Sequence, residues 1–286
     1  MSARARRTPA RAGLFCGLVA LAACHTAPGS GGPGEAPQEV PTFRSGTADL
    51  AYAIDLPPGT GPFPAAVLVH GSGTVRRSDL LFLSRLLVAR GVAVLRYDKR
   101  GVGESSGVYS PVGTRNSLEM IPLLASDAAA AIELLAARPE VDRSRVGLVG
   151  GSQAGWIIPV AASLSSNVSW AVILSGPTVS VGREIAYSDL VEVDHLSLEA
   201  AEDALLSYSG PEGFDPRPVL DRTSVPTLWL YGLVDDSIPT RACLAVHAEL
   251  QASHPFDVLT YPTLGHALGP AVWDDVYRWL DSHGIR

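Results

Sequence analysis

Lysine is almost absent from this chain, and positive charge as a whole is in the minority. The 286 residues contain one lysine and 21 arginines against 29 Asp and Glu, which gives a formal net charge of −7. Four arginines and no acids lie in residues 1–23, so removal of that segment would take the net charge from −7 to −11. Because phosphate binding requires a clustered positive surface, we expect no nucleic-acid partner. The single lysine is typical of a GC-rich coding bias.

Cysteine and paired metal ligands are also sparse. Of the three cysteines, Cys16 and Cys24 lie near the N-terminus, and Cys243 alone lies in the region that we expect to fold. That region therefore cannot form an internal disulfide and must be stabilised by its hydrophobic core. The seven histidines lack the paired spacing typical of a metal site. We expect no metal and no cofactor.

The first 23 residues have the pattern of a secretory signal peptide. Basic residues precede an apolar run over residues 14–23, which is too short to span a bilayer as a helix. The run ends in Leu21-Ala22-Ala23-Cys24, which resembles the lipobox of bacterial lipoproteins. The resemblance implies an exported protein, lipidated on Cys24 and tethered to a cell-envelope membrane on its periplasmic or extracellular face. An ordinary signal peptide that contains a cysteine is the alternative.

A change in composition marks the beginning of the folded part. Residues 25–40, rich in Pro, Gly and Ala, are predicted to be a flexible linker, and residues 41–286 one domain. An antiparallel strand is expected near residues 50–56. Short apolar runs then alternate with helical periodicity, which predicts an α/β fold with a doubly wound, mostly parallel sheet. The runs cover residues 65–70, 92–97, 146–149, 170–174, 227–231 and 256–261.

The longest interval between predicted strands covers about residues 177–225. We predict that it forms a small helical cap over the active site whose candidate residues are given below. Its acids Glu199, Glu202 and Asp203 could contact a substrate amine. They also suit the outer face of a helix over residues 198–208, so we give them no role in the site.

The most informative segment is an apolar run that ends in small residues around one serine. Residues 146–149 are followed by the sequence Gly-Gly-Ser-Gln-Ala-Gly at positions 150–155, with Ser152 in the middle. This pattern is typical of a nucleophile elbow, a sharp turn from a buried strand into a helix. Such a turn lifts the serine hydroxyl clear of the sheet and directs the free N–H groups of the first helical turn toward it.

Two further polar residues follow predicted strands. Asp235 comes shortly after the strand at residues 227–231, and His266 comes after the strand at residues 256–261. Because the carboxyl ends of parallel strands lie at one edge of a sheet, we expect these residues to approach Ser152 there. Their chain order is Ser, Asp, His, as in the α/β-hydrolase arrangement.

From about residue 48 to its end, the chain resembles the α/β-hydrolases, closest to the esterase and dienelactone-hydrolase-like branch that borders on the serine peptidases. Residues 69–73, Val-His-Gly-Ser-Gly, resemble the oxyanion loop of these enzymes, and residues 96–105 resemble the turn after the next strand. Ala154 is a departure, because the commonest elbow has glycine at this position. Alanine still satisfies the need for a small residue.

The resemblance implies a catalytic triad. Ser152 is the expected nucleophile, His266 the general base, and Asp235 the carboxylate that orients the imidazole. The spacing to the Ile-Pro pair at residues 238–239 favours Asp235 over its neighbour Asp236.

The resemblance also implies an oxyanion hole formed by the backbone N–H groups of Ser72 and Gln153. We expect His70 to support the oxyanion loop through packing or a hydrogen bond. The charged turn after the next strand is expected to brace loops near the site; its residues are Asp98, Arg100, Glu104 and Ser105.

These features predict a lipid-anchored serine hydrolase that cleaves small-molecule carboxylic esters through an acyl-enzyme. An exopeptidase or amidase with the same catalytic residues is the first alternative. A non-catalytic, tethered binding module is the second, and its signature would be the loss of a triad residue. All three triad residues are present in the sequence.

Overall fold

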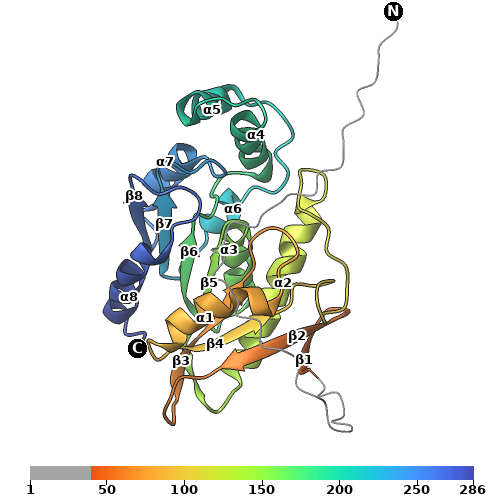
Figure 1. Cartoon of the computed structure of the whole chain (residues 1–286), viewed down its shortest axis with the longest axis vertical. Coiled ribbons are helices and arrows are strands. Elements are labelled where there is room, and N and C mark those ends of the chain that lie inside the picture. Colours follow the sequence, from red (N-terminus) through yellow and green to blue (C-terminus); the bar gives the residue numbers. More distant parts are fainter. Residues whose placement is uncertain (1–39) are drawn as a thin grey trace, which may run out of the picture. The chain divides into compact units, whose positions relative to one another are not determined.

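An eight-stranded sheet forms the core of the structure, a computed structural model that describes residues 40–286 (Figure 1). The predicted signal peptide, Cys24 and the predicted linker up to residue 39 lie outside the described residues. The strands follow the order β1-β2-β4-β3-β5-β6-β7-β8. Their bounds are β1 (Thr42–Ser45), β2 (Ala48–Asp55), β3 (Phe63–Val69), β4 (Ala93–Tyr97), β5 (Val141–Gly151), β6 (Val168–Leu174), β7 (Thr227–Gly232) and β8 (Phe256–Tyr261).

The strand directions confirm the predicted α/β fold with a mostly parallel sheet. β2 pairs antiparallel with both β1 and β4, whereas β3 to β8 pair in parallel. β3 lies between β4 and β5, so the chain first adds a strand on one side of β3 and then crosses to the other side. This reversal opens a crevice at the carboxyl ends of the strands, where ligands bind in sheets of this kind.

Helices cover both faces of the sheet. Along β3, Ala65 and Val67 join the core cluster that includes α2, α3 and α7, while Ala66 and Leu68 join the cluster that includes α1 and α8. Because successive side chains of a strand point to opposite faces, a continuous apolar run can serve both layers. The helix bounds are α1 (Leu81–Val88), α2 (Ser117–Ala136), α3 (Ala154–Leu164), α7 (Thr240–Leu250) and α8 (Trp273–Ser282).

The connection from β6 to β7 occupies the interval for which the sequence predicts a cap. It contains α4 (Val181–Glu192), α5 (Leu198–Ala204), a 3₁₀ turn (Leu205–Ser207) and α6 (Arg217–Leu220). α4 and α5 lie beyond the end of the sheet and pack on each other (Figure 1), with Tyr187, Ala201 and Leu205 buried between them. Ser180 and Ser197 cap the two helices by accepting hydrogen bonds from backbone N–H groups.

The strands differ from the sequence prediction in two places. β1 is a four-residue edge strand that has no predicted counterpart. β5 begins at Val141, five residues before the predicted apolar run. Residues 142–145 extend the strand through their backbone, but their side chains are polar and exposed or half-buried. Neither segment has the uninterrupted apolar pattern that marks a buried strand.

Residues 40–286 contain neither a membrane-spanning helix nor a cluster of metal ligands. No helix in that range is long and apolar enough to cross a membrane. The same residues contain no group of three or more His, Cys, Asp or Glu side chains placed to hold a metal ion.

A buried ion pair joins the turn after β4 to α2. The guanidinium of Arg100 donates from Nε to Asp127 Oδ2 at 2.8 Å and from Nη2 to Asp127 Oδ1, and the side chains are 5% and 1% exposed.

Removal of one partner would leave a buried charge without compensation. We predict that Asp127→Ala lowers the free energy of unfolding by about 3–5 kcal/mol, measured by urea denaturation.

The exposed pair between Arg90 and Asp281 provides the control for this prediction. Its side chains are 45% and 42% exposed, so Asp281→Ala should change the free energy of unfolding by at most about 1 kcal/mol. Equal effects of Asp127→Ala and Asp281→Ala would contradict a special contribution of the buried pair.

Candidate active site

Ser152 lies at the sharp turn between β5 and α3. Its φ of 56° is in the left-handed region, which non-glycine residues rarely adopt. The Ser152 N–H donates to Leu174 O at 2.9 Å, and the Gly155 N–H donates to Ser152 O at 2.8 Å. These bonds fix the turn against the end of β6 and leave the half-buried serine side chain at the carboxyl edge of the sheet.

Close packing explains the small residues of the turn. A Cβ at Gly150 would lie 2.6 Å from both Ala154 Cβ and Val69 O, and a Cβ at Gly155 would lie 2.7 Å from the Gly176 backbone. Both positions therefore require glycine. Ala154 is fully buried and its Cβ fills the space beside Gly150, which shows how the turn accommodates alanine where glycine is usual.

Asp235 and His266 meet above the ends of β7 and β8. His266 Nδ1 lies 3.0 Å from Asp235 Oδ2 and 3.2 Å from Oδ1. The Asp235 side chain is fully buried, and its Oδ1 also accepts backbone N–H groups of Ser237 and Ile238, each at 2.8 Å. Asp236, the alternative carboxylate, is exposed.

Backbone contacts bring the serine turn and the histidine loop to the same place. Ser152 N–H is bound to Leu174 O, and the next residue, Ser175, donates its hydroxyl to His266 O at 2.9 Å. The end of β6 thus contacts both predicted catalytic residues. Gly232, at the end of β7, has no room for a Cβ, which would lie 2.2 Å from Leu264 O in the loop that carries His266.

The predicted oxyanion loop lies beside Ser152. A Cβ at Gly71 would be 3.7 Å from Ser152 Cβ, so the peptide between Gly71 and Ser72 passes close to the serine. Gln153 is the N-cap of α3, and the N–H groups of a first helical turn have no acceptor within the helix. The Gly71–Ser72 peptide and the start of α3 at Gln153 therefore both lie near Ser152.

His70 supports this loop, as the sequence predicts. Its Nε2 lies 2.6 Å from Tyr97 O, and its ring packs edge-on against the Tyr97 ring. Burial, together with the nearby Lys99 charge, lowers the pKa of His70 to about 3. The imidazole is therefore neutral at physiological pH, and a neutral ring is suited to a structural role.

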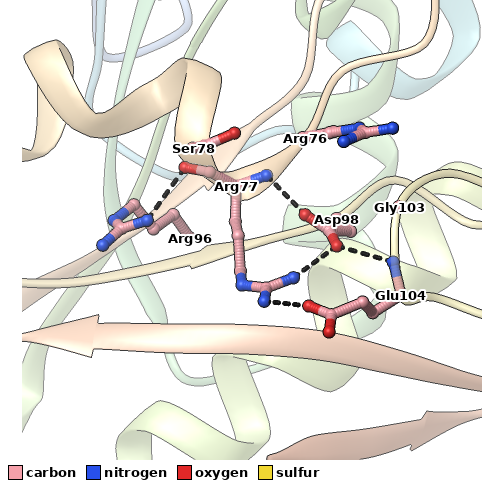
Figure 2. Close-up of a pocket in the computed structure, with 7 residues that line it drawn as sticks. All are labelled: Arg76, Arg77, Ser78, Arg96, Asp98, Gly103 and Glu104. Carbon is pink, nitrogen blue, oxygen red and sulfur yellow. Dashed lines mark hydrogen bonds and ion pairs between the residues drawn. The ribbon is translucent and has the colours of Figure 1, made fainter. Parts of the chain in front are cut away.

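The charged turn after β4 braces the segment that follows the oxyanion loop (Figure 2). Asp98 accepts the Arg77 N–H at 2.6 Å and the Glu104 N–H at 2.9 Å, and it pairs with the Arg77 guanidinium. Arg77 also pairs with Glu104. Ser105 donates its hydroxyl to Asp98 O at 2.7 Å. These contacts agree with the predicted bracing role and account for the polar pocket in Figure 2.

Lys99 is the residue that the sequence interpretation misses. It is fully buried, and its Nζ donates to Gly71 O at 2.6 Å and to Gly73 O at 2.9 Å, both in the oxyanion loop. The only sequence signal that could have pointed to Lys99 is that lysine occurs at no other position.

A second pocket, of about 460 Å³, lies between the cap, α7 and the loop after β7. It is lined mostly by apolar surface and is bordered by Asp235. Its lining residues are Tyr187, Leu198, Glu199, Glu202, Leu233, Asp235, Thr240, Arg241 and Leu244.

One cap residue lies where the sequence interpretation does not place it. Glu202 was expected on the outer face of its helix but is buried. Its carboxylate accepts the Arg241 N–H at 2.7 Å and the Ala242 N–H at 3.3 Å, so it binds the N-terminus of α7. The attraction between a carboxylate and a helix N-terminus explains the correction, and helical periodicity within the cap alone could not reveal it.

Glu184, on α4, is a further cap acid that the sequence does not single out. Burial raises the pKa of its carboxyl to about 8, and the charge of Asp235 adds to the shift. A carboxyl group with this pKa is mostly protonated at neutral pH and can donate a hydrogen bond.

Comparison with known sequences gives a family and distant relatives. The model of the prolyl oligopeptidase family, Peptidase_S9, matches residues 81–283. Esterase EstD of Thermotoga maritima is 25% identical over 249 residues, which cover 77% of this chain and 58% of that protein. Acyl-coenzyme A thioesterase 3 of Mus musculus is 26% identical over 230 residues, covering 75% and 50%. The chain therefore spans only 58% and 50% of the length of these two relatives.

Solved structures share the fold. Acetyl xylan esterase from Paenibacillus sp. R4 superimposes with a TM-score of 0.60 at 22% identity, covering 85% of this chain and 88% of that one. An esterase of Pyrococcus furiosus gives a TM-score of 0.64 at 17% identity, covering 85% and 90%. The expected α/β-hydrolase fold is thereby confirmed. Together with the family match over residues 81–283, this shows that the chain belongs to the prolyl oligopeptidase family of the α/β-hydrolase superfamily.

Proposed function

We propose that this chain is a serine hydrolase that cleaves small-molecule carboxylic esters through an acyl-enzyme. The observation that carries the proposal is the pairing of His266 with the buried Asp235 at the sheet edge where Ser152 occupies a positive-φ turn. A buried carboxylate that holds one imidazole nitrogen leaves the other nitrogen to act as a base.

The reaction follows from these positions. Ser152 Oγ attacks the ester carbonyl carbon while His266 Nε2 accepts the hydroxyl proton. The negative oxygen of the tetrahedral intermediate binds to the N–H groups of Ser72 and Gln153. Collapse of the intermediate breaks the ester C–O bond, and His266 returns the proton to the leaving alcohol. Water then attacks the acyl-enzyme by the same steps and releases the acid.

The relatives support ester cleavage, since their names describe an esterase and an acyl-coenzyme A thioesterase. The family name favours the alternative, a peptidase or amidase. Two of the cap acids considered for binding a substrate amine are already paired. Glu202 binds the N-terminus of α7, and Asp203 accepts from the Arg241 guanidinium at 2.6 Å. These pairings make an amine-binding cluster in α5 a weaker proposal than ester cleavage.

We also propose that the mature protein is anchored to a cell-envelope membrane by lipid on Cys24. The proposal is supported by the lipobox-like sequence Leu21-Ala22-Ala23-Cys24 and by the apolar run before it. Acyl chains would hold the enzyme at the membrane without inserting the hydrolase domain.

Ser152→Ala should lower ester hydrolysis by roughly 10⁴- to 10⁶-fold, because it removes the proposed nucleophile. The test uses nitrophenyl esters from acetyl to long-chain acyl groups, together with aminoacyl nitroanilides. Ser72→Ala is the matched control and should lose at most about tenfold, because its backbone N–H is retained. Anilide turnover in place of ester turnover would favour the peptidase alternative. Activity that survives Ser152→Ala would reject Ser152 as the nucleophile, and a folded but inactive wild type would favour the binding module.

Asp235→Asn should lower kcat by about 10⁴-fold, because an amide stabilises the wrong imidazole tautomer. The adjacent Asp236→Asn removes the same charge from an exposed position and should leave kcat within about twofold. Steady-state kinetics of both variants with one nitrophenyl ester make the comparison. A larger loss in Asp236→Asn than in Asp235→Asn would reverse the assignment.

Cys24→Ser should move the protein from the membrane fraction to the soluble envelope fraction and abolish incorporation of radiolabelled palmitate in a bacterial host. Cys16→Ser is the control, because Cys16 lies within the predicted signal peptide and should affect neither property. A wild type that incorporates no palmitate and already lies in the soluble envelope fraction would support an ordinary signal peptide instead.

A further inference from the structure

The only lysine of the chain is buried beneath the candidate oxyanion hole. Lys99 follows β4 and has no exposed surface. Lysine is almost never fully buried unless its charge is compensated. A chain that uses arginine at 21 other positions thus retains its one lysine at an unfavourable position, which calls for a physical explanation.

The Lys99 ammonium contacts three separate acceptors. It donates to Gly71 O at 2.6 Å, to Gly73 O at 2.9 Å and to Gln153 Oε1 at 3.4 Å. Its Nζ also lies 4.3 Å from the centre of the Tyr109 ring, whose hydroxyl accepts the Gly73 N–H at 3.2 Å. Three donors at a single nitrogen fit this arrangement, whereas the planar guanidinium of arginine is larger and suits paired acceptors.

The bond to Gly71 O acts directly on one of the expected oxyanion donors. Gly71 C=O and Ser72 N–H belong to the same peptide group, and in a trans peptide they point in opposite directions. An ammonium that binds the carbonyl therefore fixes the direction of the N–H on the far side. It also polarises the peptide, which makes that N–H a stronger donor.

We propose that Lys99 is the positioning residue of the oxyanion hole. Its ammonium holds the Gly71–Ser72 peptide from one side and the Gln153 side chain from the other, so that the N–H groups of Ser72 and Gln153 converge on one point. The buried positive charge also favours the negative charge that develops there. This inference rests on the serine hydrolase proposed above.

The charge of Lys99 is the only one in this cluster that changes near neutral pH. Burial lowers the pKa of Lys99 to about 7, although its three acceptors and the Tyr109 ring favour the charged form. The facing titratable groups are His70, with a pKa lowered to about 3, and Tyr109, with a pKa raised by burial. Both stay neutral between pH 5 and pH 9. Lys99 is charged below its pKa. Its ammonium therefore holds the oxyanion-hole groups in place at lower pH, and this hold is lost as the pH rises through about 7.

The test measures how fast a fluorophosphonate labels Ser152 between pH 5 and pH 9, because the phosphoryl oxygen of this probe occupies the oxyanion hole. At pH 6, Lys99→Met should slow labelling by roughly 10²-fold, as expected for the loss of an oxyanion donor. Its profile should also lack the fall in rate on the alkaline side. Lys99→Arg, which stays charged at every pH tested, should likewise lack that fall. Arg90→Met, at an exposed cation, is the control and should stay within about twofold.

Amide hydrogen exchange of residues 70–74 gives a readout that needs no reaction. It should be faster in Lys99→Met than in the wild type, and if Lys99→Met does not fold, the Lys99→Arg profile decides. Unchanged exchange, an unchanged alkaline fall, or faster exchange with unchanged labelling would each overturn the proposal. A wild type that is not labelled at Ser152 would refute the proposed function, and the exchange experiment would still show whether Lys99 holds the loop.

Discussion

The close approach of β5 to α3 is the constraint on which the candidate site depends. Because Gly150 and Gly155 have no Cβ, the strand can turn into the helix within two residues. This tight turn puts Ser152 in the left-handed region, a conformation that costs of order 1–3 kcal/mol and persists only when the surroundings determine it. The bond from Ser152 N–H to the end of β6 is part of that determination. The other loops of the site are arranged around this fixed point.

Much of the architecture can be predicted from the sequence, because buried parallel strands consist of continuous apolar runs. The polar residues that follow these runs can be placed at one edge of the sheet, which brings out Ser152, Asp235 and His266 without any structure. The edge strand β1 and the polar first half of β5 leave no such run, since their residues are held by backbone pairing. The sequence shows which side chains are apolar, but it does not show which polar segments form strands through backbone pairing.

The sequence does not reveal the contacts of Glu202 and Lys99, for a common reason. Each binds backbone groups of a distant segment: Glu202 the first N–H groups of α7, and Lys99 the carbonyls of the oxyanion loop. A backbone group is present at every position, so the partner leaves no mark in the sequence. The same holds for Tyr187, whose hydroxyl donates to Asp235 O at 2.7 Å and ties α4 of the cap to the loop that carries the carboxylate. This bond links the cap to the backbone of the residue that pairs with His266.

The burial of Lys99 has a chemical consequence for the whole molecule. Apart from the α-amine at the start of the chain, the Lys99 ammonium is the only primary amine in the sequence, and it has no exposed surface. Succinimidyl esters and other amine-directed reagents therefore find no side-chain target on the native domain. Their reaction with Lys99 requires the oxyanion loop to open or the domain to unfold, so acylation of this one residue would serve as a built-in reporter of both events.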